Sequence, residues 1–225
     1  MPPSPSTSPA PPGRIERYQH WRDRYAREAD RCARYEKSRN GSALKRLSGA
    51  FDGRMVRRAL RGLAPGSRVL DIPCGGGRIS RALRPLDLDV IAADYSIWML
   101  QMLRKHADSP HRGVRADALR LPFRDGAFEA SVCFRFMQAV PRALRIRALA
   151  ELGRVSRRVI VSYPHVTSVR GLRRSLIGRA PRANRVTETE VAREVEAAGL
   201  VVSSFEYKVR VFFEDFVVVA SPADS

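Results

Sequence analysis

The chain has 225 residues, which is enough for one α/β domain of ordinary size with an appendage but not for two full domains. Hydrophobic residues make up 44% and charged residues 28%, as in globular proteins, and no run reaches the ~18 apolar residues of a membrane span. The net charge of +18 rests on arginine, since only four of the 41 basic residues are lysines, so by itself it says little about a nucleic-acid partner.

The N-terminal residues 1–13, MPPSPSTSPAPPG, are rich in proline and serine, so we expect a disordered tail. They lack the basic start and apolar stretch of a secretory signal, which predicts a cytoplasmic protein. Cys32, Cys74 and Cys133 lie far apart without a C-x-x-C pair, which argues against a disulfide framework and against a zinc site. No metal is expected.

Aromatic residues recur at helical spacing after this tail and predict an amphipathic helix over residues 15–37. We interpret the stripe as core packing, with cover over a substrate as the alternative. A second helix is expected over residues 50–63, so that residues 14–63 form an N-terminal helical extension. The aromatic residues of the stripe are Tyr18, Trp21, Tyr25 and Tyr35.

From residue 64 on, short apolar runs alternate with helical patterns, which is typical of βαβ units and of a parallel sheet covered on both faces. Two final runs, 200–209 and 211–220, are so close in sequence that they must pair antiparallel, because a parallel crossover needs a dozen residues or more. Residues 64–225 are therefore predicted to form one α/β domain. Its other strands are expected at 68–72, 88–93, 113–116, 129–134 and 159–163, and its helices at 78–84, 96–106, 142–155 and 188–198.

A glycine-rich turn follows the first predicted strand. The strand ends in Asp71, and Gly75, Gly76 and Gly77 then open a helix. Glycines let the backbone approach a ligand, and a helix start offers N–H groups to it. The second strand ends in Asp94, an acid placed where it can accept both hydroxyls of a ribose. The pattern predicts a nucleotide-type cofactor.

The third strand is followed by Ala116-Asp117-Ala118, then Leu121-Pro122-Phe123 and Asp125-Gly126-Ala127-Phe128. As an ordered set, these motifs and the glycine turn resemble the class I S-adenosylmethionine-dependent methyltransferases, especially the small-molecule branch that includes quinone-biosynthesis enzymes. The resemblance implies a Rossmann-like fold with a mostly parallel seven-stranded sheet and an antiparallel last strand. It implies S-adenosylmethionine as the cofactor.

The resemblance also assigns roles at the methionine end of the cofactor. Asp71 would help to orient that end, and Gly75 and Gly77 would line the bend around it. In this chain Pro73 replaces the first glycine of the family's motif, which fixes the backbone angle φ and removes an N–H donor.

At the nucleoside end, the resemblance implies that Asp94 holds the ribose and that Tyr95 flanks the adenine. Asp117 would bind the adenine amino group, with Ala118 beside it. A purely structural role at a strand end is the alternative for each of these polar side chains. A NAD-binding fold is the other cofactor hypothesis, but its fingerprint requires glycine or alanine where this chain has Ser80.

The acceptor side departs from the quinone-type relatives. After the fourth strand many of them have F-x-x-H-H-x-P, whereas this chain continues Arg135-Phe136-Met137-Gln138, without either histidine. If the acceptor is a hydroxyl, a base must take its proton, and we name His165 and Tyr163, which lie at the end of the fifth strand, as catalytic candidates.

Residues 131–185 hold thirteen basic residues and one acidic residue, and within them the segment 164–185 is expected to form a basic insert. One interpretation is a solvated surface helix. The other is an amphipathic flap that recruits an anionic substrate, an anionic membrane surface or RNA phosphates.

The sequence thus predicts an S-adenosylmethionine-dependent methyltransferase with a small-molecule or lipid-like acceptor, an anionic acceptor included. The protein would be cytoplasmic, with peripheral membrane contact as an option. Two alternatives stay open: an RNA methyltransferase that uses the basic block, and a non-catalytic cofactor-binding partner subunit.

Overall fold

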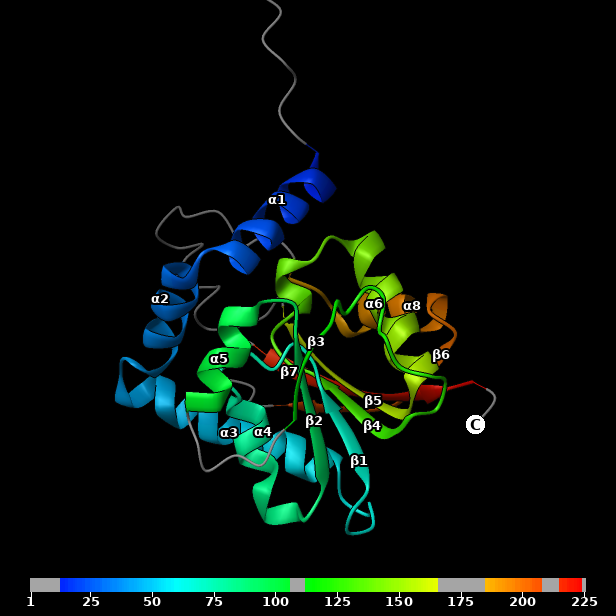
Figure 1. Cartoon of the computed structure of the whole chain (residues 1–225). Coiled ribbons are helices and arrows are strands. Elements are labelled where there is room, and N and C mark those ends of the chain that lie inside the picture. The colour runs from blue at the N-terminus through cyan, green and yellow to red at the C-terminus, as the bar shows by residue number, and fades with distance from the viewer. Residues whose placement is uncertain (1–12, 106–111, 166–184, 208–214, 224–225) are drawn as a thin grey trace, which may run out of the picture.

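The computed structural model describes residues 13–105, 112–165, 185–207 and 215–223. Figure 1 shows a twisted sheet between two groups of helices, with the N-terminal helices on one side. Residues 1–12 of the predicted tail 1–13 and residues 166–184 of the predicted basic insert lie outside the described residues.

One seven-stranded sheet has the order β3-β2-β1-β4-β5-β7-β6. Strands β1 to β5 are parallel, and β7 pairs antiparallel with both β5 and β6, which confirms the predicted fold class. The strands are β1 Arg68–Asp71, β2 Asp89–Asp94, β3 Arg112–Arg115, β4 Phe128–Cys133, β5 Ser156–Pro164, β6 Leu200–Tyr207 and β7 Asp215–Pro222.

Alternate residues of each strand face opposite layers of helices, because side chains of a strand alternate between the two faces of its sheet. Val69 packs with α3 (Ala43–Ala59) and α4 (Arg78–Leu83), whereas Leu70 belongs to the cluster of α6 (Arg142–Val155) and α8 (Glu188–Ala197). Helix α5 (Ile97–Lys105) packs on the α4 side through Leu100 and Leu103. Two short 3-10 helices complete the described part, η1 Arg84–Leu86 and η2 Met137–Ala139.

The N-terminal helices differ from the sequence prediction. The single helix expected over 15–37 is two helices, α1 Arg14–Arg27 and α2 Ala29–Asn40, separated by Glu28 in an extended conformation. The Glu28 carboxylate accepts hydrogen bonds from Arg24 at 2.8 Å and Arg31 at 2.9 Å, one on each helix, so it stabilises the break. Helix α3 begins at Ala43 rather than at residue 50, because Ser42 caps its first turn.

The three cysteines are free and buried. Within the described part of the chain, no group of three or more His, Cys, Asp or Glu side chains could hold a metal ion. None of the helices described is both long and apolar enough to cross a lipid bilayer.

Candidate active site

A cavity opens at the carboxyl ends of the parallel strands, where open α/β sheets bind their ligands. Helices α1 and α2 form its roof. The roof residues are Tyr18, Trp21, Arg22, Tyr25 and Tyr35. The remaining lining residues follow β1, β2, β3 and β4 and are Ile72, Pro73, Gly75, Asp94, Tyr95, Ala116, Asp117, Ala118, Phe134, Arg135, Phe136, Gln138 and Ala139.

The glycine turn after β1 is held from within by Asp71. Its Oδ2 accepts hydrogen bonds from the backbone N–H of Ser80 at 3.0 Å and from the Ser80 hydroxyl at 2.5 Å. The Asp71 side chain is fully buried, which raises the pKa of its carboxyl to about 7. Asp71 is not among the described residues that line the cavity, so it acts on the turn rather than on the cavity wall.

The turn itself needs glycine. Gly75 and Gly77 have φ angles of +53° and +79°, a backbone region that residues with a Cβ rarely adopt. A Cβ on Gly77 would overlap the Leu103 side chain, and one on Gly76 would come within 2.9 Å of the Glu36 carboxyl carbon. The Glu36 carboxylate of α2 accepts a hydrogen bond from the Gly76 N–H at 3.3 Å, so an acid from the roof lies against the turn. The sequence prediction missed Glu36.

Asp94 joins the end of β2 to this turn. Its two oxygens accept hydrogen bonds from the backbone N–H groups of Gly75 at 2.9 Å and Ser96 at 2.8 Å. The side chain lines the cavity although it is only 2% exposed, and burial raises the pKa of its carboxyl to about 6. The structure thus brings together two of the predicted cofactor residues, Asp94 and Gly75.

Tyr95, Asp117 and Ala118 also line the cavity, at the ends of β2 and β3. Arg22 from α1 lies across this region. Its guanidinium carbon is 4.7 Å from the centre of the Tyr95 ring, and its Nη1 is 2.8 Å from Asp117 Oδ2. Sequence reasoning missed Arg22, although Tyr18, Arg22 and Tyr25 are spaced to share one helix face, which is a signal that could have found it.

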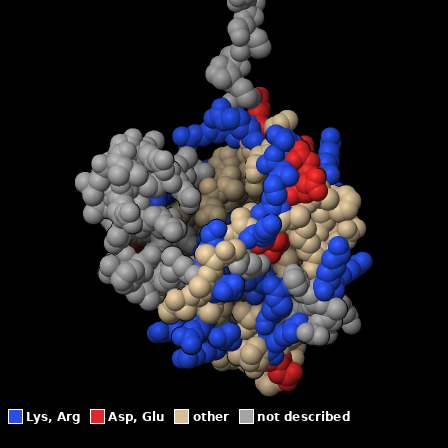
Figure 2. Space-filling model, turned by 90° about the vertical axis from the view of Figure 1, so that its left-hand side faces the viewer, with Lys and Arg blue, Asp and Glu red and all other residues tan. Residues whose placement is uncertain are grey.

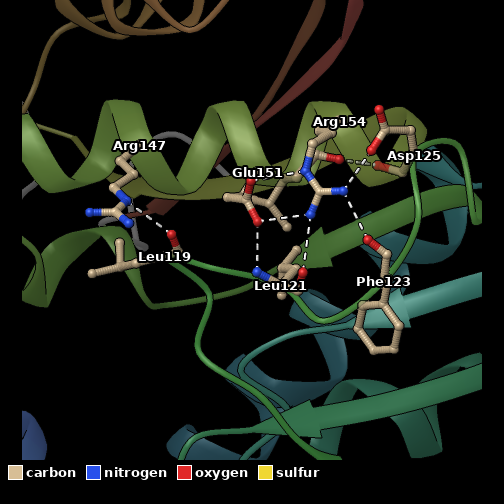
Figure 3. Close-up of polar contacts among 9 residues, drawn as sticks. Leu119, Leu121, Phe123, Asp125, Arg147, Glu151 and Arg154 are labelled. Carbon is tan, nitrogen blue, oxygen red and sulfur yellow. Dashed lines mark hydrogen bonds and ion pairs between the residues drawn. The ribbon is translucent and has the colours of Figure 1, made fainter.

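The loop that carries Asp117 and Ala118 is fastened to helix α6 (Figure 3). Arg154 donates hydrogen bonds to the carbonyl oxygens of Leu121 at 3.0 Å and Phe123 at 2.8 Å. Glu151 bonds both the Leu121 N–H at 2.6 Å and the Arg154 Nε at 2.9 Å. These contacts explain the L-P-F-x-D-G motif: its backbone polar groups bind a fixed pair of side chains on α6.

The aromatic stripe packs as core only in part, through Tyr18, which corrects the interpretation favoured from the sequence. Only Tyr18 is buried, whereas Trp21 and Tyr35 remain 38% and 39% exposed and line the cavity. The rings form a ladder, with centroid distances of 6.0 Å from Tyr18 to Trp21, 5.3 Å from Trp21 to Tyr25 and 6.1 Å from Tyr25 to Tyr35. Figure 2 shows this side of the molecule hollowed beneath the start of the described chain, with uncharged residues in the hollow and basic side chains around it.

Arg135 follows β4 and lines the other part of the cavity. Its φ angle of +60° is rare for a residue with a side chain, a conformation that costs about 1–3 kcal/mol and that persists where the surroundings impose it. Those surroundings are visible: the Arg135 N–H donates to Ser162 Oγ at 2.7 Å, and its Nε and Nη2 are each 3.3 Å from Asp52 Oδ2. Asp52 is fully buried on α3 and also contacts Arg78 at 2.5 Å.

Among the described residues that line the cavity, neither of the two catalytic candidates is present. Tyr163 is 1% exposed, its hydroxyl donates to Glu194 at 3.4 Å, and burial raises its pKa well above 10, so the hydroxyl stays protonated and cannot act as the base. His165 lies 3.0 Å from Glu188 and packs its ring edge-on against Phe216. Both side chains therefore contact the α8 and β7 side of the sheet.

Residues 69–158 match the family model described as "Methyltransferase domain". Over this segment the chain is similar to a family of methyltransferase domains. The matched segment contains the glycine turn, Asp94, Asp117 and helix α6, while α1 and α2 lie before it.

Two curated relatives have quinone-biosynthesis names. The chain is 34% identical over 111 residues to a demethylmenaquinone methyltransferase of Renibacterium salmoninarum, covering 47% of this chain and 45% of that protein. It is 36% identical over 101 residues to a ubiquinone biosynthesis O-methyltransferase of Xanthomonas campestris, covering 42% and 41%. The matched part therefore spans less than half of either relative.

Solved structures share the fold over more of the chain. The magnesium protoporphyrin IX methyltransferase of Synechocystis, crystallised with bound SAH, superposes with a TM-score of 0.72 at 17% identity, covering 91% of this chain and 99% of that one. The likeness includes the seven-stranded Rossmann-like arrangement and, at this identity, shows the fold alone.

Proposed function

We propose that this protein is an S-adenosylmethionine-dependent methyltransferase that acts on a small-molecule or lipid-like acceptor. The observation that carries the proposal is the cavity, which combines the glycine turn and the buried Asp94 with an aromatic roof. The lining residues fit the cofactor. Gly75 leaves room at the turn, and Asp94 presents carboxylate oxygens for ribose hydroxyls. Tyr95 and Asp117, which Arg22 contacts, would flank the adenine.

The bound cofactor would supply a methyl group already activated on a sulfonium. What this chain must add is alignment and exclusion of water. Residues after β4 and the rings of α1 and α2 form the part of the cavity beyond the glycine turn, where an acceptor would lie. Burial raises the pKa values of the Tyr18 and Tyr25 hydroxyls well above 10, so these groups stay protonated in the roof.

The kind of acceptor is supported by the shape of the site and by the relatives. An aromatic roof binds planar or apolar molecules, and the curated relative of Renibacterium salmoninarum is named for demethylmenaquinone, which contains a planar ring. Peripheral contact with an anionic membrane stays a prediction, since it rests on arginines of residues 166–184, outside the described part of the chain.

The test is product discovery with isotope-labelled S-adenosylmethionine. The native protein is incubated with lipid and metabolite extracts of its source cells, and mass spectrometry searches for labelled products. Asp94→Ala serves as the impaired variant, and Asp89→Ala, at the other and exposed end of β2, as its matched control. We expect a labelled small molecule with the native protein and Asp89→Ala but not with Asp94→Ala. Label that appears only in RNA, or in no molecule at all, would contradict the proposal.

A further inference from the structure

The part of the cavity beyond the glycine turn is lined by exposed aromatic rings and by Arg135, whose guanidinium is held by Asp52. We propose, building on the function proposed above, that the acceptor is a planar aromatic molecule with a carboxylate or similar anionic group, and that Arg135 binds this group. Arg135 is then a specificity-determining residue.

The rings supply the first half of the argument. Trp21 and Tyr35 are large, lie against a cavity and still leave more than a third of their surface exposed. Trp21 and Tyr25 stack on each other with 21° between their planes, so together they form one aromatic surface along α1. Stacking a planar ring on this surface would bury apolar area in the geometry that aromatic pairs prefer.

The place of Arg135 in the sheet supplies the second half. Strand β1 lies between β2, which carries Asp94, and β4, which precedes Arg135. Arg135 therefore lines the cavity on the side of β1 away from Asp94 and Asp117. The two acids belong to the cofactor side, and Asp117 is already paired with Arg22. An anionic group beside Arg135 is thus separated from them by the width of a strand or more.

The guanidinium is also held in a defined position. Asp52 bonds two of its nitrogens, Ser162 bonds its backbone, and the side chain is only 13% exposed. Asp52 is shared with Arg78, so one carboxylate contacts two guanidinium groups. A pre-oriented guanidinium suits a carboxylate better than a mobile lysine would, because its planar set of donors matches the two oxygens.

The experiment uses two ligands of nearly the same shape, 2-naphthoate and 2-naphthamide, in which a neutral amide replaces the charged carboxylate. Each is titrated by calorimetry into the full chain saturated with S-adenosylhomocysteine. We expect naphthoate to bind more tightly than naphthamide by about tenfold or more, the range for a hydrogen bond to a charged group. Arg135→Gln should reduce the naphthoate affinity to that of naphthamide, while Trp21→Ala should weaken both ligands alike, by about fivefold.

Controls keep the result interpretable. Arg157→Gln removes an exposed arginine of β5 and should leave both ligands unaffected. If Arg135→Gln does not fold, Arg135→Gly replaces it, since glycine favours the positive φ found at this position. Binding of S-adenosylhomocysteine is measured first and separates the two proposals. If the native protein does not bind it, the proposed methyltransferase function is refuted, whatever the acceptor. Three results obtained with S-adenosylhomocysteine bound would overturn the proposed acceptor class. They are equal affinity for the two naphthalene ligands, binding of neither ligand, and a naphthoate preference that persists in the Arg135 variant.

Discussion

The carboxyl ends of β4 and β5 are neighbours in the sheet, yet their polar side chains have different surroundings. Arg135, after β4, lines the cavity, whereas Tyr163 and His165, at the end of β5, bond to acids of α8. Glu188 accepts hydrogen bonds from Tyr207 at 2.6 Å and from His165, which lowers the pKa of its carboxyl to about 2. A position at the carboxyl edge of a parallel sheet is thus insufficient to mark a catalytic residue, because the next layer of helices decides whether the side chain faces a cavity or a partner.

The largest effect is expected on stability, from the buried network beside β5. Glu194 is 1% exposed and pairs with Arg145 at 2.7 Å, and Arg145 is itself buried. Glu194→Ala should lower the free energy of unfolding by about 3–5 kcal/mol, because it leaves a buried guanidinium without its carboxylate. Urea unfolding measures this. Glu196→Ala, exposed on the same helix, should change stability little. Equal losses of unfolding free energy in the two variants would show that the Glu194–Arg145 pair is not the source of the stability. Weaker cofactor binding by the folded Glu194 variant would remove the contrast between the β5 side and the cavity side.

The cavity side should show a pH dependence that the β5 side lacks. Because the pKa of Asp94 is raised to about 6, its ionised form prevails above that pH and is lost below it. The affinity for S-adenosylhomocysteine should therefore be constant at pH 7–8 and fall about tenfold per pH unit below 6, as expected for one ionised group required for binding. Titrations from pH 5 to 8 check this. Asp94→Asn should bind weakly at every pH with a flat profile, and a slope retained in that variant would assign the dependence to another group.

A smaller effect is expected from the clamp between α6 and the loop after β3. Arg154→Met removes the hydrogen bonds to the Leu121 and Phe123 carbonyl oxygens. Cofactor binding should weaken by about 1 kcal/mol, the net value of one such bond, because the loop carries Asp117 and Ala118. Calorimetry with S-adenosylhomocysteine measures this, with Arg157→Gln as the control. Faster amide exchange confined to the loop would support the account, whereas unchanged affinity despite a loosened loop would separate the clamp from the site.

The smallest effects are expected from the two candidates at the end of β5. Tyr163→Phe and His165→Gln should each leave transfer of labelled methyl to the acceptor within about twofold of the native rate, since neither side chain lines the cavity. The assay is the extract incubation described above. A loss of several orders of magnitude with retained cofactor affinity would instead place one of them at the reacting atoms.

Elements whose determinants lie close together in sequence could be predicted. The apolar runs of the strands, the glycine turn and the short link before β7 predicted the sheet and the place of Gly75 and Asp94 at its edge, because each depends on neighbours within a few residues. The break at Glu28 was missed because charged residues surround it, so the helical pattern continues unchanged across it. Arg22 and Arg135 were missed as paired residues because their partners, Asp117 and Asp52, are 95 and 83 residues away in the chain.

The central claim is that the cavity after β1 and β2 binds S-adenosylmethionine, and the most direct measurement is calorimetric titration of S-adenosylhomocysteine into three proteins. The native chain should bind one equivalent. Asp94→Ala should lose about 1.5–3 kcal/mol of binding free energy, the range for hydrogen bonds to a charged group, and Asp89→Ala at the opposite end of the same strand should bind like the native chain. Absence of binding by the native chain, or native affinity in Asp94→Ala, would contradict the claim.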